Sequence, residues 1–229
     1  MVKIGVIGAM SVETEHLCAK LQEKKVSQSA HLTFNEGIIN GTHVVIVKSG
    51  IGKVNAAMCA TVLIERFSVT HIINTGVAGS MQDDLHIFDI VVSTDAVQHD
   101  FNTVGFGYEI GIIPQMETSI FCADPFLIEC AKKAWDQTDF TKKMVEGRIA
   151  TGDIFVNSCE QKNIIRKHFN PMCVEMEGAA IAHVCSLYAI PFVIIRCMSD
   201  TAENVEEEYH EETAAHMSGV LVEKMLSLV

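Results

Sequence analysis

The segment HVVIVKSGIGKVNAAMCATVLIER, residues 43–66, contains the pattern that decides the fold class. It begins with an apolar, β-branched run at 43–49, passes through a glycine turn, and continues with helical periodicity at 53–66. Short apolar runs of this kind are typical of strands buried on both faces. The segment therefore predicts a strand followed directly by a helix, which is the repeating unit of layered α/β folds.

The same alternation continues on both sides of this segment. Buried strands are predicted at 3–9, 69–75, 88–93, 172–175 and 190–197, and helices at about 11–23, 125–136, 177–188 and 211–228. Asn40-Gly41 lies between two strand-like runs and predicts a hairpin, so the sheet should be mixed rather than all parallel. We predict an α/β, single-domain three-layer fold over 1–229, with a central mixed β-sheet flanked by helices.

The charge balance excludes several classes of partner. The chain has 17 basic and 29 acidic side chains, a formal charge of -12, which repels a nucleic acid backbone and an anionic membrane surface. Glu13 and Glu15 interrupt any N-terminal signal-like run, and no stretch reaches the roughly 18 apolar residues of a membrane span. The eight cysteines show no C-x-x-C spacing and lie mostly among apolar residues. We expect a cytoplasmic protein.

Six short segments share one position, just after an apolar run. They are GAMSVE (8–13), SGIGK (49–53), NTGVAGS (74–80), TGDIF (151–155), EMEG (175–178) and RCMSD (196–200). Loops that leave the carboxyl ends of strands line the ligand crevice of an open α/β sheet. These segments therefore predict a composite pocket for a mid-sized ligand with little or no charge.

Common cofactor motifs are incomplete in this sequence. GVIGAM lacks the third glycine of a dinucleotide fingerprint, and KSGIGKV lacks both the first glycine and the final Ser or Thr of a P-loop. The ten histidines show no H-x-x-x-H grouping, and no G-x-S-x-G elbow is present. We expect no cofactor and no metal.

Four acids, Glu13, Glu175, Glu177 and Asp200, lie in or next to apolar sequence within these segments. Glu13 could be a first-turn acid of a helix, and Glu177 or Asp200 could be a helix cap. Alternatively, one or two of them act as general acid or base, because that chemistry needs carboxyls in different environments. The local sequence leaves both interpretations open.

The motifs taken together resemble a known family. IGVIGAM with Glu13, SGIGKVNAA (49–57), INTGVAG (73–79), TGDIFV (151–156), VEMEGAAIAHVC (174–185) and PFVIIRCMSD (191–200) occur in this order. They resemble the bacterial 5'-methylthioadenosine/S-adenosylhomocysteine nucleosidases of the purine nucleoside phosphorylase-like superfamily. The pattern HD...FGYE...P at 99–114 narrows the resemblance to the nucleosidase branch, and the resemblance covers nearly the whole chain.

The resemblance implies hydrolysis of the N-glycosidic bond of an adenine nucleoside. Asp200 would be the general acid that protonates adenine N7, with Ser199 orienting it. Glu13 would be the general base for the attacking water, with Arg196 near the same water. This division of labour follows the logic of inverting sugar hydrolysis.

The resemblance also implies how the substrate is held. Glu177 would bind the ribose hydroxyls beside the Met176 backbone, while Glu175 would have a structural role. Phe155 would stack on adenine, and the Val156 backbone would read its edge.

Residues near the 5'-substituent and the water follow from the same resemblance. Met10 and Ile51 would line the 5'-thio subsite, and Val77 stands where many members carry a serine that holds the water. Phe106 and Pro114 would enter the pocket of the neighbouring subunit, which makes a homodimer part of the site.

Three alternatives are open. A phosphorylase of the same fold would need a cationic anion site, and only one of the four arginines lies in a site motif. A 6-amino-6-deoxyfutalosine hydrolase would share the adenine and ribose contacts. A silent adenosine-binding protein would be expected to lack Glu13 or Asp200.

The segment 205–216 departs from the family's usual lid sequence. Tyr209 aligns with the aromatic residue of that lid.

Overall fold

Strands and helices alternate through most of the chain in the computed structural model, which describes residues 2–203 and 209–229. The strands are β1 Lys3–Gly8, β2 Gln22–Ser29, β3 Leu32–Ile39, β4 Thr42–Lys48, β5 His71–Ser80, β6 Ile90–Gln98, β7 Phe121–Cys122, β8 Met144–Thr151, β9 Cys173–Glu175 and β10 Phe192–Asp200. The helices are α1 Ser11–Lys20, α2 Lys53–Phe67, α3 Pro125–Trp135, α4 Cys159–Phe169, α5 Gly178–Tyr188 and α6 Glu211–Met225, with a short 3-10 helix, η1, at Val104–Phe106.

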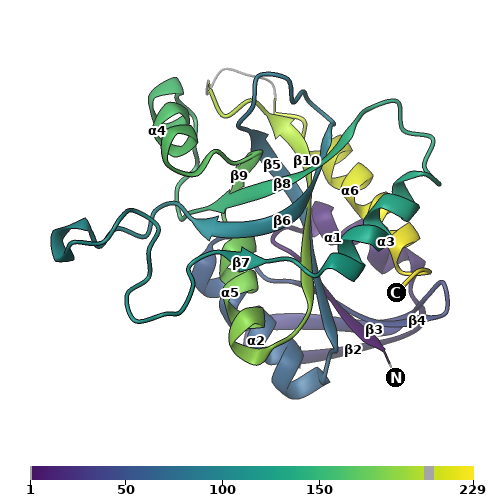
Figure 1. Ribbon diagram of the computed structural model, residues 1–229. Helices are drawn as coiled ribbons and strands as arrows, with labels where there is room; N and C mark the ends of the chain where they lie inside the picture. Colours follow the sequence, from purple (N-terminus) through teal and green to yellow (C-terminus); the bar gives the residue numbers. More distant parts are fainter. Residues whose placement is uncertain (1, 204–208) are drawn as a thin grey trace.

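The strands form one mixed sheet. β1 pairs in parallel with β4 and β5, and β5 pairs in parallel with β10. On the other side of β4, β3 pairs antiparallel with β4, and β2 pairs antiparallel with β3. β10 also pairs antiparallel with β6, and pairing continues through β8 and β9 back to β5, so this part of the sheet closes on itself. Helices α1, α3 and α6 pack together, as do α2 and α5, on either side of the sheet (Figure 1). The predicted fold class is confirmed.

The segment 43–66 forms the predicted strand and helix, β4 and α2. Its turn needs glycine, because Gly50 and Gly52 have φ of 87° and 94°, a region that disfavours other residues. The predicted hairpin is also present between β3 and β4, where Asn40 and Gly41 have φ of 50° and 86°. Both positive φ values fit a type I′ turn.

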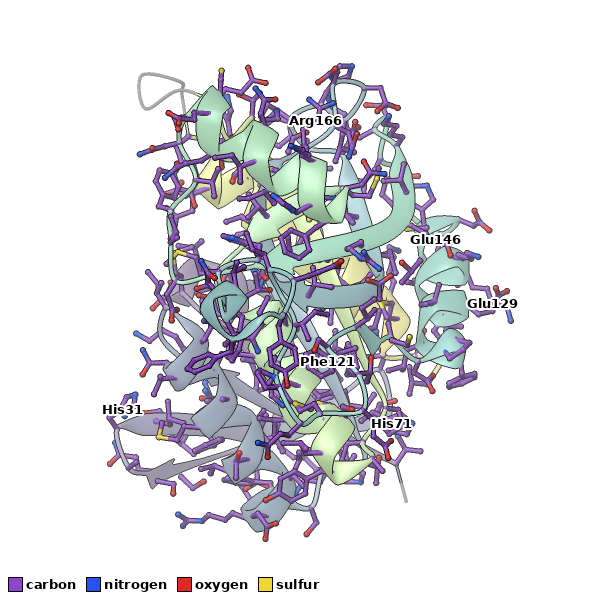
Figure 2. The ribbon with its side chains drawn as sticks, turned by 60° about the vertical axis from the view of Figure 1, so that its left-hand side comes forward. His31, His71, Phe121, Glu129, Glu146 and Arg166 are labelled. Carbon is purple, nitrogen blue, oxygen red and sulfur yellow. The ribbon has the colours of Figure 1, made fainter. Side chains whose placement is uncertain are left out.

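Several elements differ from the sequence prediction or escaped it. Leu21 is extended (φ -62°, ψ 121°), so α1 stops at Lys20 instead of reaching 23, and β2 begins at Gln22. β2 has the polar sequence QEKKVSQS and is largely exposed, so it carries no apolar alternation. β8 and α4 were also not predicted. α4 lies at the opposite end of the molecule from the β2–β3 turn, as Arg166 and His31 show in Figure 2.

No described helix is both long and apolar enough to cross a bilayer. Residues 205–208 of the expected lid segment lie outside the described part of the chain.

Candidate active site

All six predicted segments contribute side chains to one pocket of about 150 Å³. Its lining includes these predicted site residues: Met10, Glu13, Ile51, Val77, Phe155, Met176, Glu177, Arg196, Ser199, Asp200 and Tyr209. Val156 is buried and lines a smaller adjoining cavity that shares Phe155, Met176 and Asp200 with the pocket. A larger depression of about 460 Å³ opens near Lys3, His43 and Phe67, at the amino ends of β1 and β4. It is an open surface feature without buried acids, so we take the smaller pocket as the candidate site.

Glu13 is both a helix-end acid and a pocket residue. It lies in the first turn of α1, where its Oε2 accepts hydrogen bonds from the N–H groups of Ala9 (2.6 Å) and Met10 (3.0 Å). Its Oε1 accepts from the Val77 N–H at 3.0 Å. The side chain is 1% exposed, and burial raises its pKa, although Arg196 and these N–H groups act in the opposite direction. The result is a buried carboxylate with increased basicity.

Arg196 lies at the centre of a buried charge cluster. Its Nη2 donates to Glu175 and, at 2.7 Å, to Asn74 Oδ1, and it lies 3.5 Å from Glu177 Oε2. Its Nη1 donates to the Val77 carbonyl at 3.2 Å and lies 3.8 Å from Glu13 Oε1. One guanidinium therefore faces three buried carboxyl groups, so the acids outnumber the cation that can balance them.

Glu177 lies at the start of α5, yet its side chain does not cap that helix. Instead its Oε1 accepts from the Gly52 N–H at 2.8 Å, across the pocket wall at the start of α2. Burial and then the neighbouring Glu175 charge raise its pKa to about 7, while Arg196 and the Gly52 N–H lower it. Burial therefore disfavours the charged form of Glu177, and Arg196 and the Gly52 N–H offset only part of that cost.

Glu175 holds the backbone turn that precedes α5. Its Oε2 accepts from the N–H groups of Glu177 (2.9 Å) and Gly178 (2.7 Å), and its Oε1 accepts from the Thr151 hydroxyl. Thr151 Oγ1 in turn accepts from the Ala179 N–H at 2.7 Å. Glu175 thus fixes the turn that carries Glu177.

Asp200 ends β10 and does not cap a helix, because residues 201–203 are not helical. Its Oδ2 accepts from the Ser199 hydroxyl at 2.9 Å and its Oδ1 from the Ala202 N–H at 2.9 Å. Tyr209 lies nearby, and burial, followed by the charges of Glu211 and Asp200, raises its pKa to about 12. Asp200 is therefore oriented on both of its oxygens.

The rest of the pocket wall is apolar. Met10, Ile51 and Met176 line it, and Phe155 stands at the mouth with 56% of its surface exposed. Such a wall suits a flat heteroaromatic ring and an apolar substituent.

Phe106 and Pro114 lie away from this pocket. They belong to the segment 99–120 between β6 and β7, which extends from the body at the left of Figure 1. Phe106 is 84% exposed in this chain.

Sequence reasoning missed two polar side chains of the site. Asn74 accepts from Arg196 and donates from Nδ2 to the Ile7 carbonyl at 2.9 Å, while Thr151 supports Glu175. Both are fully buried in strands, and their polarity within apolar runs was the available signal. Within the described residues, no cluster of three or more His, Cys, Asp or Glu side chains could hold a metal ion.

This chain is similar along its whole length to known proteins. The phosphorylase superfamily model matches residues 3–227. The 5'-methylthioadenosine/S-adenosylhomocysteine nucleosidase of Shewanella denitrificans is 44% identical over 98% of this chain and 99% of its own. The crystal structure of the Neisseria meningitidis nucleosidase of that name, in complex with methylthio-immucillin-A, is 37% identical, with a TM-score of 0.95 and complete coverage of both chains.

A Helicobacter pylori futalosine hydrolase is also similar, at 30% identity, with a TM-score of 0.93 and coverage of 100% of this chain and 98% of that one. The resemblance seen in the sequence motifs is confirmed. The chain belongs to the phosphorylase superfamily and, within it, to the family of 5'-methylthioadenosine/S-adenosylhomocysteine nucleosidases, which are N-glycosyl hydrolases.

Proposed function

We propose that this chain hydrolyses the N-glycosidic bond of 5'-methylthioadenosine and S-adenosylhomocysteine, releasing adenine and the 5-thioribose product. The observation that carries the proposal is the presence of Glu13, Glu177 and Asp200 in one pocket with an apolar wall. The relatives named for this activity, one of them bound to methylthio-immucillin-A, support it. Residues 1–229 would act as one nucleosidase domain.

Asp200 is the proposed general acid. Adenine is a poor leaving group as an anion, so a proton must reach N7 as the bond to the sugar stretches. The Ser199 hydroxyl and the Ala202 N–H fix the two oxygens of Asp200, which reduces the reorganisation needed for that transfer.

Glu13 is the proposed general base for water. Its raised pKa makes the carboxylate a better proton acceptor, and three backbone N–H groups hold it in place. Val77 offers no hydroxyl here, so among the described residues Glu13 and Arg196 would position the water.

Glu177 is the proposed ligand of the ribose hydroxyls, beside the Met176 backbone. Positive charge develops on the sugar in the transition state, and a carboxylate in a dry pocket acts strongly on such a charge. The excess of carboxylates over the Arg196 guanidinium reinforces this effect.

The apolar wall accounts for the remaining groups of the substrate. Phe155 would stack on adenine, and the Val156 backbone would read the edge of the base. Met10 and Ile51 would contact the 5'-thio substituent. None of these contacts requires a charged 5'-group.

The charges disfavour a phosphorylase. Among the described residues, Arg196 is the arginine that lines the pocket, and it is already engaged by Glu175 and Asn74. Arg148 and Arg166 pair with Asp95 and Asp83 elsewhere. A phosphate dianion would therefore meet carboxylates rather than a free cationic site.

We propose further that the protein is a cytoplasmic homodimer that serves methionine salvage. Apolar side chains of the segment between β6 and β7 are exposed in the single chain, among them Val104, Phe106 and Tyr108. Burying them against a second copy would bring Phe106 and Pro114 into its pocket. Sedimentation of the wild type and of Phe106→Ala would test the dimer and its link to activity.

The experiment that tests the activity is adenine release from 5'-methylthioadenosine, S-adenosylhomocysteine and 6-amino-6-deoxyfutalosine, with and without phosphate. We expect free methylthioribose without phosphate. The futalosine-type substrate is included because a futalosine hydrolase shares this fold. Strict phosphate dependence would indicate a phosphorylase, and binding without adenine release would indicate a silent binding protein.

A further inference from the structure

A chain of hydrogen bonds outside the pocket joins its ribose side to its adenine side. At the start of α2, the Gly52 N–H donates to Glu177 Oε1 inside the pocket (2.8 Å). The next N–H, that of Lys53, donates to Asp153 Oδ1 at 2.8 Å. Asp153 belongs to the loop 152–156, which also carries Phe155 and Val156. Two consecutive N–H groups at the start of α2 thus bind two acids, Glu177 on the ribose side and Asp153 on the adenine side.

Asp100 links the side chain of Lys53 to the backbone of Asp153. Its Oδ1 accepts from Lys53 Nζ at 2.6 Å, and its Oδ2 accepts from the Asp153 N–H at 2.8 Å. The side chains of Lys53 and Asp100 are only 19% and 13% exposed, so their attraction is less screened than that of a surface pair. Lys53 Nζ also lies 3.3 Å from Gln98 Oε1, at the end of β6.

Glycines allow the backbones to approach this closely. A Cβ on Gly52 would lie 3.0 Å from Asp153 Oδ1, and Gly52 has a φ of 94°. A Cβ on Gly152 would collide with the His99 ring and crowd Asp100. The start of α2 and the loop 152–156 are therefore packed against each other with little room for adjustment.

We propose that Lys53, Asp100 and Asp153 form a brace of positioning residues that keeps the Gly52–Glu177 contact in register with the loop bearing Phe155 and Val156. This inference rests on the proposed function. Ribose and adenine are joined by the bond that breaks, so the two walls must be held at a fixed separation. A displacement of about 1 Å in such a site can reduce the rate about 100-fold.

The brace also acts on the charge of Glu177. The Gly52 N–H is one of the groups that lower the pKa of Glu177. If α2 shifts away, that hydrogen bond weakens and the pKa rises further. The acid limb of the pH profile therefore reports on the brace, whereas a general loss of stability would not move it.

The test compares Asp153→Ala with Asp153→Asn in the full chain. Asp153→Ala removes the acceptor for the Lys53 N–H, so we expect kcat/KM for 5'-methylthioadenosine to fall about 10- to 100-fold, with the acid limb moved to higher pH. Asp153→Asn keeps an amide oxygen at the same position and should retain kcat/KM within about threefold of wild type. Asp83→Ala is the matched control, since Asp83 is an exposed acid that pairs with Arg166 of α4, the residue labelled in Figure 2.

A double-variant cycle sharpens the test. Because Asp100 and Asp153 act in one network, Asp100→Ala with Asp153→Ala should be little worse than the more damaging single change. Fully additive losses, or equal losses for Asp153→Ala and Asp153→Asn, would overturn the brace. An active wild type with an equally active Asp153→Ala would also overturn it. An inactive wild type would instead contradict the proposed function.

Discussion

The two ends of α1 hold carboxylates in opposite ways. At its first turn, Glu13 is buried in the pocket, and burial raises its pKa. Further along, His16 and Lys20 meet Glu223 of α6, at 2.6 Å and 3.3 Å. Partial burial raises the pKa of Glu223, but the hydrogen bonds from His16 and Lys20 outweigh it and the net pKa is lowered.

The opposite pKa shifts of Glu13 and Glu223 have opposite effects on stability. A carboxyl whose pKa is lowered on folding stabilises the protein above its unfolded pKa, and this contribution is lost as pH falls through the folded value. A carboxyl whose pKa is raised does the reverse, because the folded state resists its ionisation. Glu13 and Glu177 therefore reduce stability at neutral pH, while Glu223 adds to it.

The largest expected effect is at Asp200. Asp200→Asn keeps the shape of the side chain and an oxygen for its hydrogen bonds but removes the transferable proton. We expect the rate of adenine release to fall about 100- to 10,000-fold, with the melting temperature little changed. Full activity in this variant would show that another group protonates adenine.

The pH dependence gives the next largest effect. Burial raises the pKa of Glu177 to about 7, so this acid gains a proton as the pH drops towards 5, and burial also raises the pKa of Glu13 above its ordinary value. The dependence of kcat/KM on pH follows the ionisation of the essential acids in the free enzyme. At pH values below the pKa of those acids, kcat/KM should therefore fall at least about tenfold for each pH unit. A rate profile measured from pH 5 to 9 checks this. A flat profile down to pH 5 would mean that the pocket acids titrate like exposed ones.

The smallest effect is at the other end of α1. Glu223→Gln removes the charge that pairs with His16 and Lys20, so we expect a loss of about 0.3 to 1 kcal/mol in unfolding free energy at pH 7 and unchanged kcat/KM. Urea unfolding measures this loss. Glu129→Gln is the control with an expected change near zero, because the side chain of Glu129 is on the exposed face of α3. If Glu223→Gln were more stable than the wild type, Glu223 would not be a stabilising acid, and the contrast with Glu13 would be wrong.

Local sequence was sufficient for much of the fold and the site. The unit 43–66, the Asn40-Gly41 hairpin and the six pocket segments all depend on patterns within a few residues. The prediction that all six are loops after strands was wrong for two of them, because 74–80 and 196–200 lie within β5 and β10. The structure brings four of those segments together because β1, β4, β5 and β10 run parallel and end at one edge. The other two, 151–155 and 175–178, follow β8 and β9, which run the opposite way and reach the same pocket because β9 pairs antiparallel with the end of β5. The roles assigned to Glu13, Glu177 and Asp200 came from the resemblance and stay predictions.

Long-range pairing could not be predicted in the same way. The closure of β5, β10, β6, β8 and β9 depends on contacts between segments far apart in the chain. β2 is polar because it is an exposed edge strand, which removes the alternation that marks a strand. The brace was missed for a similar reason, since Lys53, Asp100 and Asp153 each look like ordinary surface charges in the sequence.

The central claim is that the pocket retains buried carboxylates at a cost in stability because the chemistry needs them. The unfolding free energy of Glu177→Gln relative to wild type, at pH 5 and pH 8, tests it most directly. From pH 5 to pH 8, the unfolding free energy of the wild type should fall by on the order of 2 kcal/mol more than that of the variant. The variant should therefore gain stability relative to the wild type at pH 8, and it should lose adenine release. A variant that is less stable than wild type at pH 8 would contradict the account.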